Sequence, residues 1–241
     1  MALFGLFGKK SDADVVRKHA ERATNRRAQA VDRWEAIQAL LRVGSPEAVE
    51  ALMPRFAFYV DPSITDQEEK DAVFDGIVQL GSEAIVPVVG FLRKAESASW
   101  SIKILDRIAT AEVVVEKLVA LLSDMDTEYE RDPQRKVQML AALEERRDPR
   151  VARCVARFLA DANETVRFHA AGALLSQPEA AAHRDDMLRC LCAEDSVRVR
   201  NRILEGFATR EWDVGANLDA VRAKLAGGYT LDARGIPRRP Q

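Results

Sequence analysis

The feature that most constrains this chain is a helical segment that recurs six times. Aligned on the residue that closes each copy, the segments have spacings of 37, 31, 35, 31 and 33 residues. The positions three and four before that residue are apolar in every copy, which is the spacing of one helix face. A repeat of this length is typical of stacked helix pairs. The closing residues are Leu40, Ile77, Ile108, Leu143, Leu174 and Phe207.

A second helix is predicted after each of the first five copies, following a short turn. Proline or an acidic residue opens most of these helices, which suits the free N–H groups and the positive dipole end of a helix. The opening segments are 46–49, 82–85, 111–114, 148–151 and 178–181.

One column of the repeat carries a cation. The second position of the segment is basic in five copies of six, and the penultimate position is Ala or Gly in five, which favours close approach of neighbouring helices. The basic positions are Arg33, Lys70, Lys136, Arg167 and Arg200, with Ser101 in the third copy; the small ones are Ala39, Gly76, Ala142, Ala173 and Gly206.

These segments resemble the HEAT-repeat family, including the shorter HEAT-like repeats of bacterial proteins and phycobilin lyases. The signature is an acid, then Val-Arg, then Ala-x-x-Ala-Leu, matched best by residues 163–174 and next by 195–200. The resemblance covers roughly residues 27–226 and implies an all-α fold, a right-handed α-α superhelix (solenoid) of about six helix pairs. In such arrays the basic residue bonds an acid or carbonyl of a neighbouring repeat, so Arg167 and Arg200 are interpreted as structural.

Three segments are expected: a flexible tail with an apolar tip over 1–14, the repeats over 15–226, and an extended cap or tail over 227–241. Within the repeats, a first helix is expected over Asp14–Thr24. Whether it ends there or continues towards Trp34 is left open. The N-terminal tip is open to two interpretations, a membrane or partner anchor and a terminal turn without binding function. Its apolar residues are Leu3, Phe4, Leu6 and Phe7.

The C-terminal segment ends the helical pattern. Gly227 and Gly228 predict a helix stop, and Asp232–Gly235 predicts a turn. We expect Tyr229 and Leu231 to cover the last repeat, and Arg238 and Arg239 are left without a predicted role.

Composition restricts the class of protein further. The net charge is −2, with 36 basic and 38 acidic residues, so no global field attracts nucleic acid. Residues 1–130 carry a balance of −6 and residues 131–241 one of +4, which suggests head-to-tail complementarity or an Arg-rich docking face. Three cysteines, no signal peptide and no long apolar run predict a cytoplasmic protein, and the family resemblance suggests a bacterial one.

No catalytic, metal or cofactor site is expected. The acidic stretch 124–132 lacks the Gly and Glu that a calcium loop requires, so we expect it to cap the helix that begins near Pro133. Cys190 and Cys192 lack a second ligand pair, and the three histidines are scattered over different repeats. No phosphate loop or nucleophile motif is present in the sequence.

The fourth second helix carries a basic ridge, since Arg150, Arg153 and Arg157 recur at helical spacing. Arg189 is expected to extend it, with Arg55 and Lys224. The ridge suits an acidic protein face, although a solvated face paired with neighbouring acids is equally compatible. We therefore expect a non-enzymatic scaffold that binds a protein partner on its concave surface. A HEAT-like lyase or maturation factor is the alternative, and a nucleic-acid-binding or base-repair protein is third.

Overall fold

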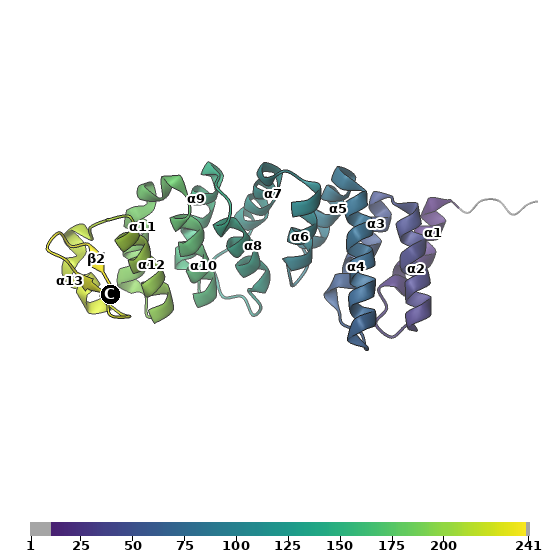
Figure 1. The fold of residues 1–241 in the computed structure, drawn as a ribbon, viewed down its shortest axis with the longest axis horizontal. Helices are drawn as coiled ribbons and strands as arrows, with labels where there is room; N and C mark the ends of the chain where they lie inside the picture. Colours follow the sequence, from purple (N-terminus) through teal and green to yellow (C-terminus); the bar gives the residue numbers. More distant parts are fainter. Residues whose placement is uncertain (1–10, 240–241) are drawn as a thin grey trace, which may run out of the picture. The chain divides into compact units, whose positions relative to one another are not determined.

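The computed structural model describes residues 11–239, and these are mostly helical (Figure 1). They form thirteen α-helices, five short 3-10 helices and one two-stranded hairpin. The all-α class that the sequence predicts is therefore confirmed. Every one of the six repeated segments lies within an α-helix, namely α2, α4, α6, α8, α10 and α12.

The chain divides into two compact units, with the boundary between Thr110 and Ala111. The boundary falls between the first and second helices of the third predicted repeat. Unit 1 contains α1 (Asp12–Ala23), α2 (Ala30–Val43), α3 (Pro46–Leu52), η1 (Met53–Ala57), α4 (Ser63–Gln79), η2 (Gly81–Ala84), α5 (Ile85–Leu92) and α6 (Ser99–Ile108).

Unit 2 contains the remaining elements. These are α7 (Ala111–Ser123), α8 (Gln134–Glu144), α9 (Pro149–Val155), η3 (Ala156–Ala160), α10 (Glu164–Leu175), η4 (Pro178–His183), α11 (Arg184–Ala193), α12 (Val197–Thr209), η5 (Gly215–Asn217), α13 (Leu218–Lys224), β1 (Thr230–Leu231) and β2 (Pro237–Arg238).

Local sequence signals place the helix starts. Ser45 accepts a hydrogen bond from the Ala48 N–H at 3.3 Å and precedes Pro46, the first residue of α3. Asn163 caps α10 in the same way, accepting from the Thr165 N–H at 2.9 Å. These side chains satisfy N–H groups that have no partner inside the helix.

The first helix departs from its expected bounds. It begins at Asp12, because Ser11 Oγ accepts the Asp14 N–H at 3.2 Å and caps it there. It also ends at Ala23 rather than continuing towards Trp34, which lies in the separate helix α2.

Each unit has two layers of helices. In unit 1, α2, α4 and α6 pack side by side in one layer, and α3 packs against α5 in the other. In unit 2, α8, α10 and α12 form one layer, while α7 packs on α9, η3 on α11, and α11 on α13. The apolar stripes of the repeats lie between the layers, each buried aliphatic side chain contributing roughly 1.5–3 kcal/mol.

The small penultimate residues of the repeat allow neighbouring repeat helices to pack closely, as the sequence predicts. A methyl group added at Gly76 of α4 would overlap Leu41, which directly follows the closing residue of the repeat segment in α2. A methyl group at Gly206 of α12 would overlap Leu175 of α10 in the same manner. The two contacts occupy equivalent positions in the two units.

The C-terminal residues fold onto the last helices of unit 2. Gly227 and Gly228 both have positive φ after α13, and the predicted turn is present, with the Gly235 N–H bonded to the Asp232 carbonyl at 2.9 Å. Strands β1 and β2 pair antiparallel, and β2 packs on α12. Tyr229 is 7% exposed, as expected of a cap, whereas Leu231 is only half-buried.

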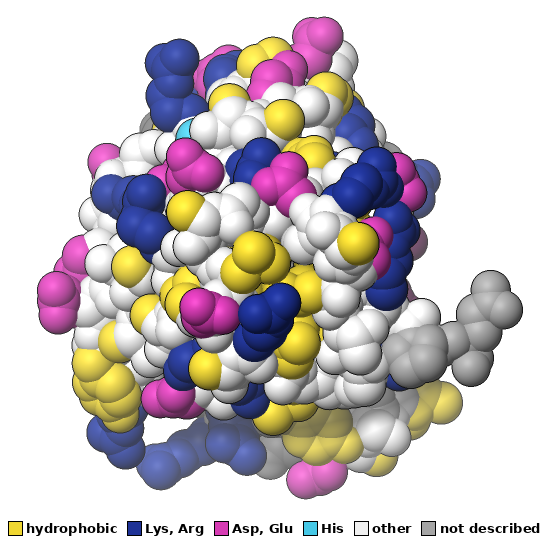
Figure 2. Space-filling view, turned by 90° about the vertical axis from the view of Figure 1, so that its left-hand side faces the viewer, with side chains coloured by type: hydrophobic (Ala, Val, Ile, Leu, Met, Phe, Trp, Pro, Cys, Tyr) yellow, Lys and Arg dark blue, Asp and Glu magenta, His cyan; other side chains and the backbone are white. Residues whose placement is uncertain are grey.

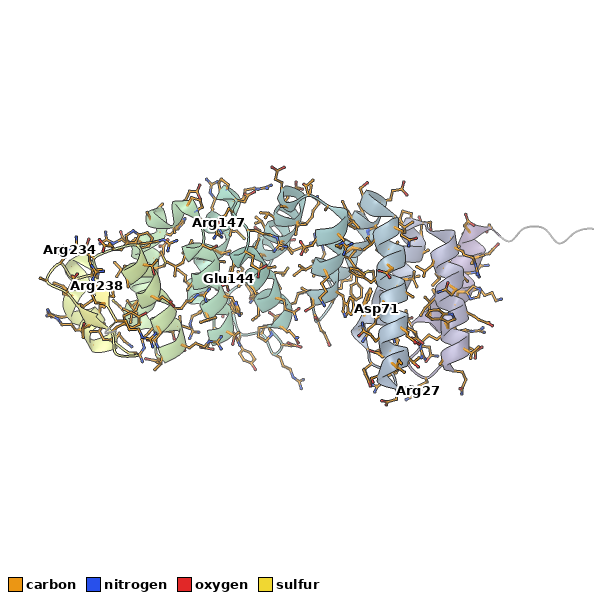
Figure 3. All side chains as sticks on the ribbon, viewed as in Figure 1. Arg27, Asp71, Glu144, Arg147, Arg234 and Arg238 are labelled. Atoms are coloured by element: carbon orange, nitrogen blue, oxygen red, sulfur yellow. The ribbon has the colours of Figure 1, made fainter. Side chains whose placement is uncertain are left out.

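Arg234 and Arg238, labelled in Figure 3, stabilise this hairpin. Both guanidinium groups pair with Glu211, at 3.3 and 3.2 Å, and Arg238 also bonds Asp232 at 3.1 Å. Arg238 therefore acts within the C-terminal cap.

Candidate groove in the second unit

Two adjoining cavities lie along the second-helix layer of unit 2. The smaller, about 400 Å³, lies between α7 and α9, and the larger, about 600 Å³, lies between η3 and α11. Arg157 lines both. We call this pair of cavities the Arg groove, because all four residues of the predicted basic ridge line it: Arg150, Arg153, Arg157 and Arg189.

The local sequence explains why α9 presents its arginines to the groove. Asp148 caps the helix by accepting the Arg150 N–H at 2.9 Å, and Pro149 occupies the first helical position. Val151, Val155 and Phe158 are fully buried. The arginines at 150, 153 and 157 recur every three or four residues and therefore lie together on the opposite, exposed side.

Two of these arginines are held in place by other groups. Arg150 forms a salt bridge with Asp148 at 2.7 Å and donates to the Glu112 carbonyl at 3.1 Å. The Asp148 carboxylate raises the pKa of Arg150 through the hydrogen bond between them. Arg157 donates to the carbonyls at the end of α7, including Leu122 at 2.8 Å, and lies over the Phe158 ring at 4.8 Å.

Arg153 differs from its two neighbours. It is exposed, and no described residue forms a hydrogen bond or ion pair with its side chain. The floor beneath it consists of Val119, Ser123 and Cys154. The Cys154 thiol is 9% exposed, and burial raises its pKa, so the sulfur is neutral at physiological pH. Arg153 is thus a cation without a counterion beside an uncharged floor.

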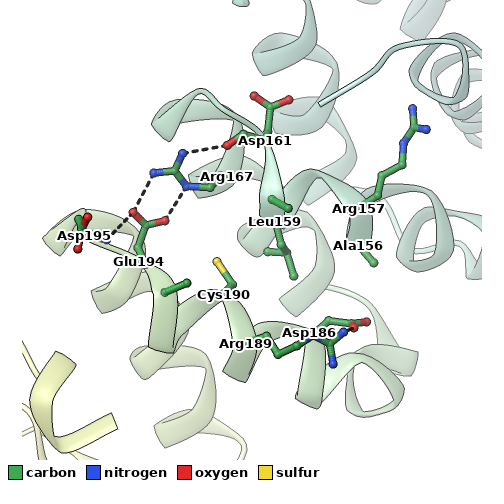
Figure 4. Close-up of a pocket in the computed structure, with 12 residues that line it drawn as sticks. Ala156, Arg157, Leu159, Asp161, Arg167, Asp186, Arg189, Cys190, Glu194 and Asp195 are labelled. Atoms are coloured by element: carbon green, nitrogen blue, oxygen red, sulfur yellow. Dashed lines mark hydrogen bonds and ion pairs between the residues drawn. The ribbon is translucent and has the colours of Figure 1, made fainter. Parts of the chain in front are cut away.

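The larger cavity has an uncharged floor and a charged rim (Figure 4). Leu159 and Cys190 form this floor, and the other uncharged side chains of the lining are Ala156, Ala160 and Ala193. Burial, reinforced by the nearby Glu194 carboxylate, raises the pKa of Cys190 to about 12, so this thiol is also neutral.

Every carboxylate on the rim of the larger cavity is paired. Glu194 bonds Arg167 at 2.6 Å, as the dashed lines of Figure 4 show. The other three pairs are Asp161 with Lys136 at 3.0 Å, Asp195 with Lys224 at 3.1 Å, and Asp186 with Arg189. The rim therefore holds charges that already satisfy one another.

The basic column of the repeat makes ion pairs within the units, and of its members only Arg167 also lines the Arg groove. In unit 2, Lys136 and Arg167 reach forward to Asp161 and Glu194, which occupy equivalent places before the next repeat helix. In unit 1, Arg33 bonds Glu69 at 2.7 Å. Arg200 is the exception among these cations, since its buried Nε has no hydrogen-bond partner in the described residues.

Lys70 and Ser101 complete the column without reaching into the following repeat. Lys70 pairs with Asp66 of its own helix at 2.7 Å. The buried Ser101 hydroxyl has no partner among residues 11–239.

One predicted extension of the ridge, Arg55, is wrong, and another, Lys224, is already paired. Arg55 belongs to unit 1 and is completely buried, with its guanidinium bonded to Glu69 at 2.7 Å and Asp66 at 2.8 Å. Lys224 is bonded to the Glu194 carbonyl and to Asp195. Neither side chain offers the groove a free cation, and the sequence pattern around them did not show these partners.

The charge asymmetry of the sequence does not distinguish the two units. Residues 1–110 hold 15 basic and 16 acidic side chains, and residues 111–241 hold 21 and 22, so each unit has a balance of −1. The acids between Glu112 and Glu130 belong to unit 2, as do the arginines of the groove. On the C-terminal end of unit 2, basic and acidic side chains are interspersed (Figure 2).

The remaining candidates of the sequence show ordinary contacts. The acidic stretch caps α8, since Asp132 accepts the Gln134 N–H at 3.1 Å. His169 bonds Glu144 at 2.6 Å, and His183 bonds Asp186 at 2.9 Å. Within residues 11–239, no three His, Cys, Asp or Glu side chains gather as metal ligands, and no single helix is long and apolar enough to span a membrane. The apolar tip, Leu3 to Phe7, lies outside the described residues.

Comparison with known proteins adds no relative: no protein-family model, no curated protein and no solved structure matches the chain.

Proposed function

We propose that this chain is a non-enzymatic scaffold of HEAT-like repeats that binds an acidic segment of a protein partner in the Arg groove. The observation that carries the proposal is Arg153, an exposed cation without a counterion between two arginines held by other groups. An Arg fork pairs well with a carboxylate. A partner carboxylate supplies the counterion that residues 11–239 do not.

The repeat architecture supports a scaffold that places this groove on a regular framework. Equivalent inter-repeat ion pairs, Lys136 with Asp161 and Arg167 with Glu194, follow one another along unit 2. Each unit has two layers of helices, as a superhelix of stacked pairs requires. Under this proposal the second-helix layer is the concave, partner-binding face, and the apolar sequence of the N-terminal tip supplies a peripheral membrane contact.

A catalytic role is less well supported. The larger cavity has the size of a small-molecule site, which the alternative of a lyase or maturation factor requires. Its rim carboxylates are all paired, and its thiol is neutral because burial raises the pKa of Cys190 to about 12. Neither cavity therefore offers an activated nucleophile or a poised general acid.

Affinity capture from a native lysate tests the proposal with two matched variants. Arg153→Glu reverses the unpaired charge without breaking an existing contact. Arg27→Glu makes the same change at an exposed arginine of unit 1 (Figure 3). We expect that wild type and Arg27→Glu retain a lysate protein that Arg153→Glu does not retain. Equal retention by all three folded proteins would overturn the assignment of the groove.

A further inference from the structure

The two cavities of the Arg groove differ in what they leave unsatisfied. The smaller cavity lacks an anion, because Arg153 has no partner among the described residues while Arg150 and Arg157 are held by Asp148 and by the α7 carbonyls. Both neighbours are therefore oriented before any ligand arrives. A carboxylate that pairs with Arg153 enters beside two guanidinium groups that are already oriented, so among the three arginines only Arg153 has to be ordered on binding.

The larger cavity suits an apolar side chain. Its rim charges pair with one another, so a ligand charge gains little there. Its floor, centred on Leu159 and Cys190, is uncharged. A cavity of about 600 Å³ accommodates a bulky side chain of a peptide. Burying such a side chain on this floor is favourable, because it removes apolar surface from water.

The packing of the helices sets the separation between the two cavities. One cavity lies between α7 and α9, and the other lies between η3, which continues α9, and α11. Measured across the helices, the two cavities are therefore about one interhelical distance apart, roughly 8–10 Å. An extended peptide rises about 3.3 Å per residue, so about three residues cover that distance.

We infer that the Arg groove recognises an extended peptide segment in which an acidic residue lies about three positions from a bulky apolar residue. The acid pairs with Arg153, and the apolar side chain occupies the larger cavity beyond Arg157. This inference rests on the proposed function and specifies its ligand. The spacing requirement distinguishes such a segment from a merely acidic one.

Fluorescence anisotropy with the full chain and synthetic peptides tests the inference. Each fluorescein-labelled peptide has a Gly/Ser background, one Asp-Glu pair and one Phe placed one to seven positions away. We expect the tightest binding at a spacing of about three, and binding at least about tenfold weaker when Phe is replaced by Ser. Equal affinity at all spacings, or no effect of removing Phe, would overturn the inference.

Three variants assign the two parts of the ligand to the two cavities. Arg153→Glu weakens the binding of every acidic peptide. Ala193→Phe fills the larger cavity from an exposed position. It therefore weakens the binding of only those peptides that contain Phe. Arg27→Glu leaves all affinities unchanged. Circular dichroism of each variant verifies that the helical fold is retained.

The outcomes separate the inference from the proposed function. If acidic peptides bind, Arg153→Glu abolishes binding and Ala193→Phe has no effect, the acidic groove stands and the two-part recognition is wrong. If the folded chain binds no acidic peptide, and a protein captured from lysate is retained equally by Arg153→Glu, the inference and the proposed function both fail.

Discussion

Lys136 Nζ lies 3.0 Å from Asp161 Oδ2, and the two side chains are only 2% and 1% exposed. The pair connects α8 to the turn before α10. A buried cation that loses its partner is costly, whereas replacing both partners by uncharged residues is much less so.

We therefore expect Asp161→Asn to lower the free energy of unfolding by about 3 kcal/mol, since Lys136 is left buried without its main counterion. The asparagine keeps the hydrogen bond from the Asn163 N–H. Urea unfolding followed by circular dichroism measures the change. In the double variant Lys136→Met/Asp161→Asn most of the stability should return, and a double variant no more stable than Asp161→Asn would contradict this account.

Glu194 makes the stability of unit 2 depend on pH. Burial acts to raise the pKa of Glu194, but hydrogen bonds from Arg167 and from the Ser196 N–H outweigh it, and the pKa lies below its ordinary value. Because the folded-state pKa is depressed, the carboxylate stabilises the fold above about pH 4.3, the value for unfolded chains. That stabilisation is lost as the pH falls through the folded-state pKa.

The matching variant is Glu194→Gln, which removes the titrating group. It should be less stable than wild type at pH 7 and should lose less stability between pH 7 and pH 3. The urea midpoint measured across this range tests the expectation. An equal loss in both proteins would show that Glu194 does not contribute to acid sensitivity.

Gly206 and Gly90 are expected to respond to alanine in opposite directions. Inside a helix, alanine is more favourable than glycine by up to about 1 kcal/mol of folding free energy. At Gly206 the added methyl group overlaps Leu175, and overpacking of this kind costs about 1–3 kcal/mol. At Gly90 of α5 nothing lies within 4 Å. Thermal unfolding should therefore show Gly206→Ala destabilised and Gly90→Ala stabilised, and the same sign for both would refute the close-packing argument.

The cysteines of unit 2 should be poorly reactive. Burial raises the pKa of Cys190 to about 12 and also raises the pKa values of Cys154 and Cys192. Only the thiolate is alkylated readily. At pH 8 we expect iodoacetamide to label Cys190 at least about a hundredfold more slowly in the folded chain than in urea, as followed by mass spectrometry. Comparable rates would contradict the buried, neutral thiol.

Local patterns in the sequence predict local structure well. The six repeat segments are helices, and the starts of α3 and α9 follow from Ser45-Pro46 and Asp148-Pro149. These features depend on side chains a few residues apart. The basic ridge at residues 150, 153 and 157 is likewise a local feature, because the spacing along one helix decides which residues share a face.

Partners distant in sequence are not predicted by such patterns. Arg55 has the spacing of a surface residue, yet it is buried against Glu69, fourteen residues later. Asp161 and Glu194 receive cations from 25 and 27 residues earlier. The family resemblance implies such a partner for Arg167, but the repeat period alone does not identify the acid, because the pairing depends on how two successive helices and their turn pack. The boundary at Thr110 is likewise set by packing.

The central claim is that a partner occupies the Arg groove. Hydrogen exchange of the full chain, measured with and without the protein recovered by affinity capture, tests it most directly. The account predicts added protection in α7, α9–η3 and α11, and none in Arg153→Glu under the same conditions. Protection confined to unit 1, or to the α8, α10 and α12 layer, would contradict it.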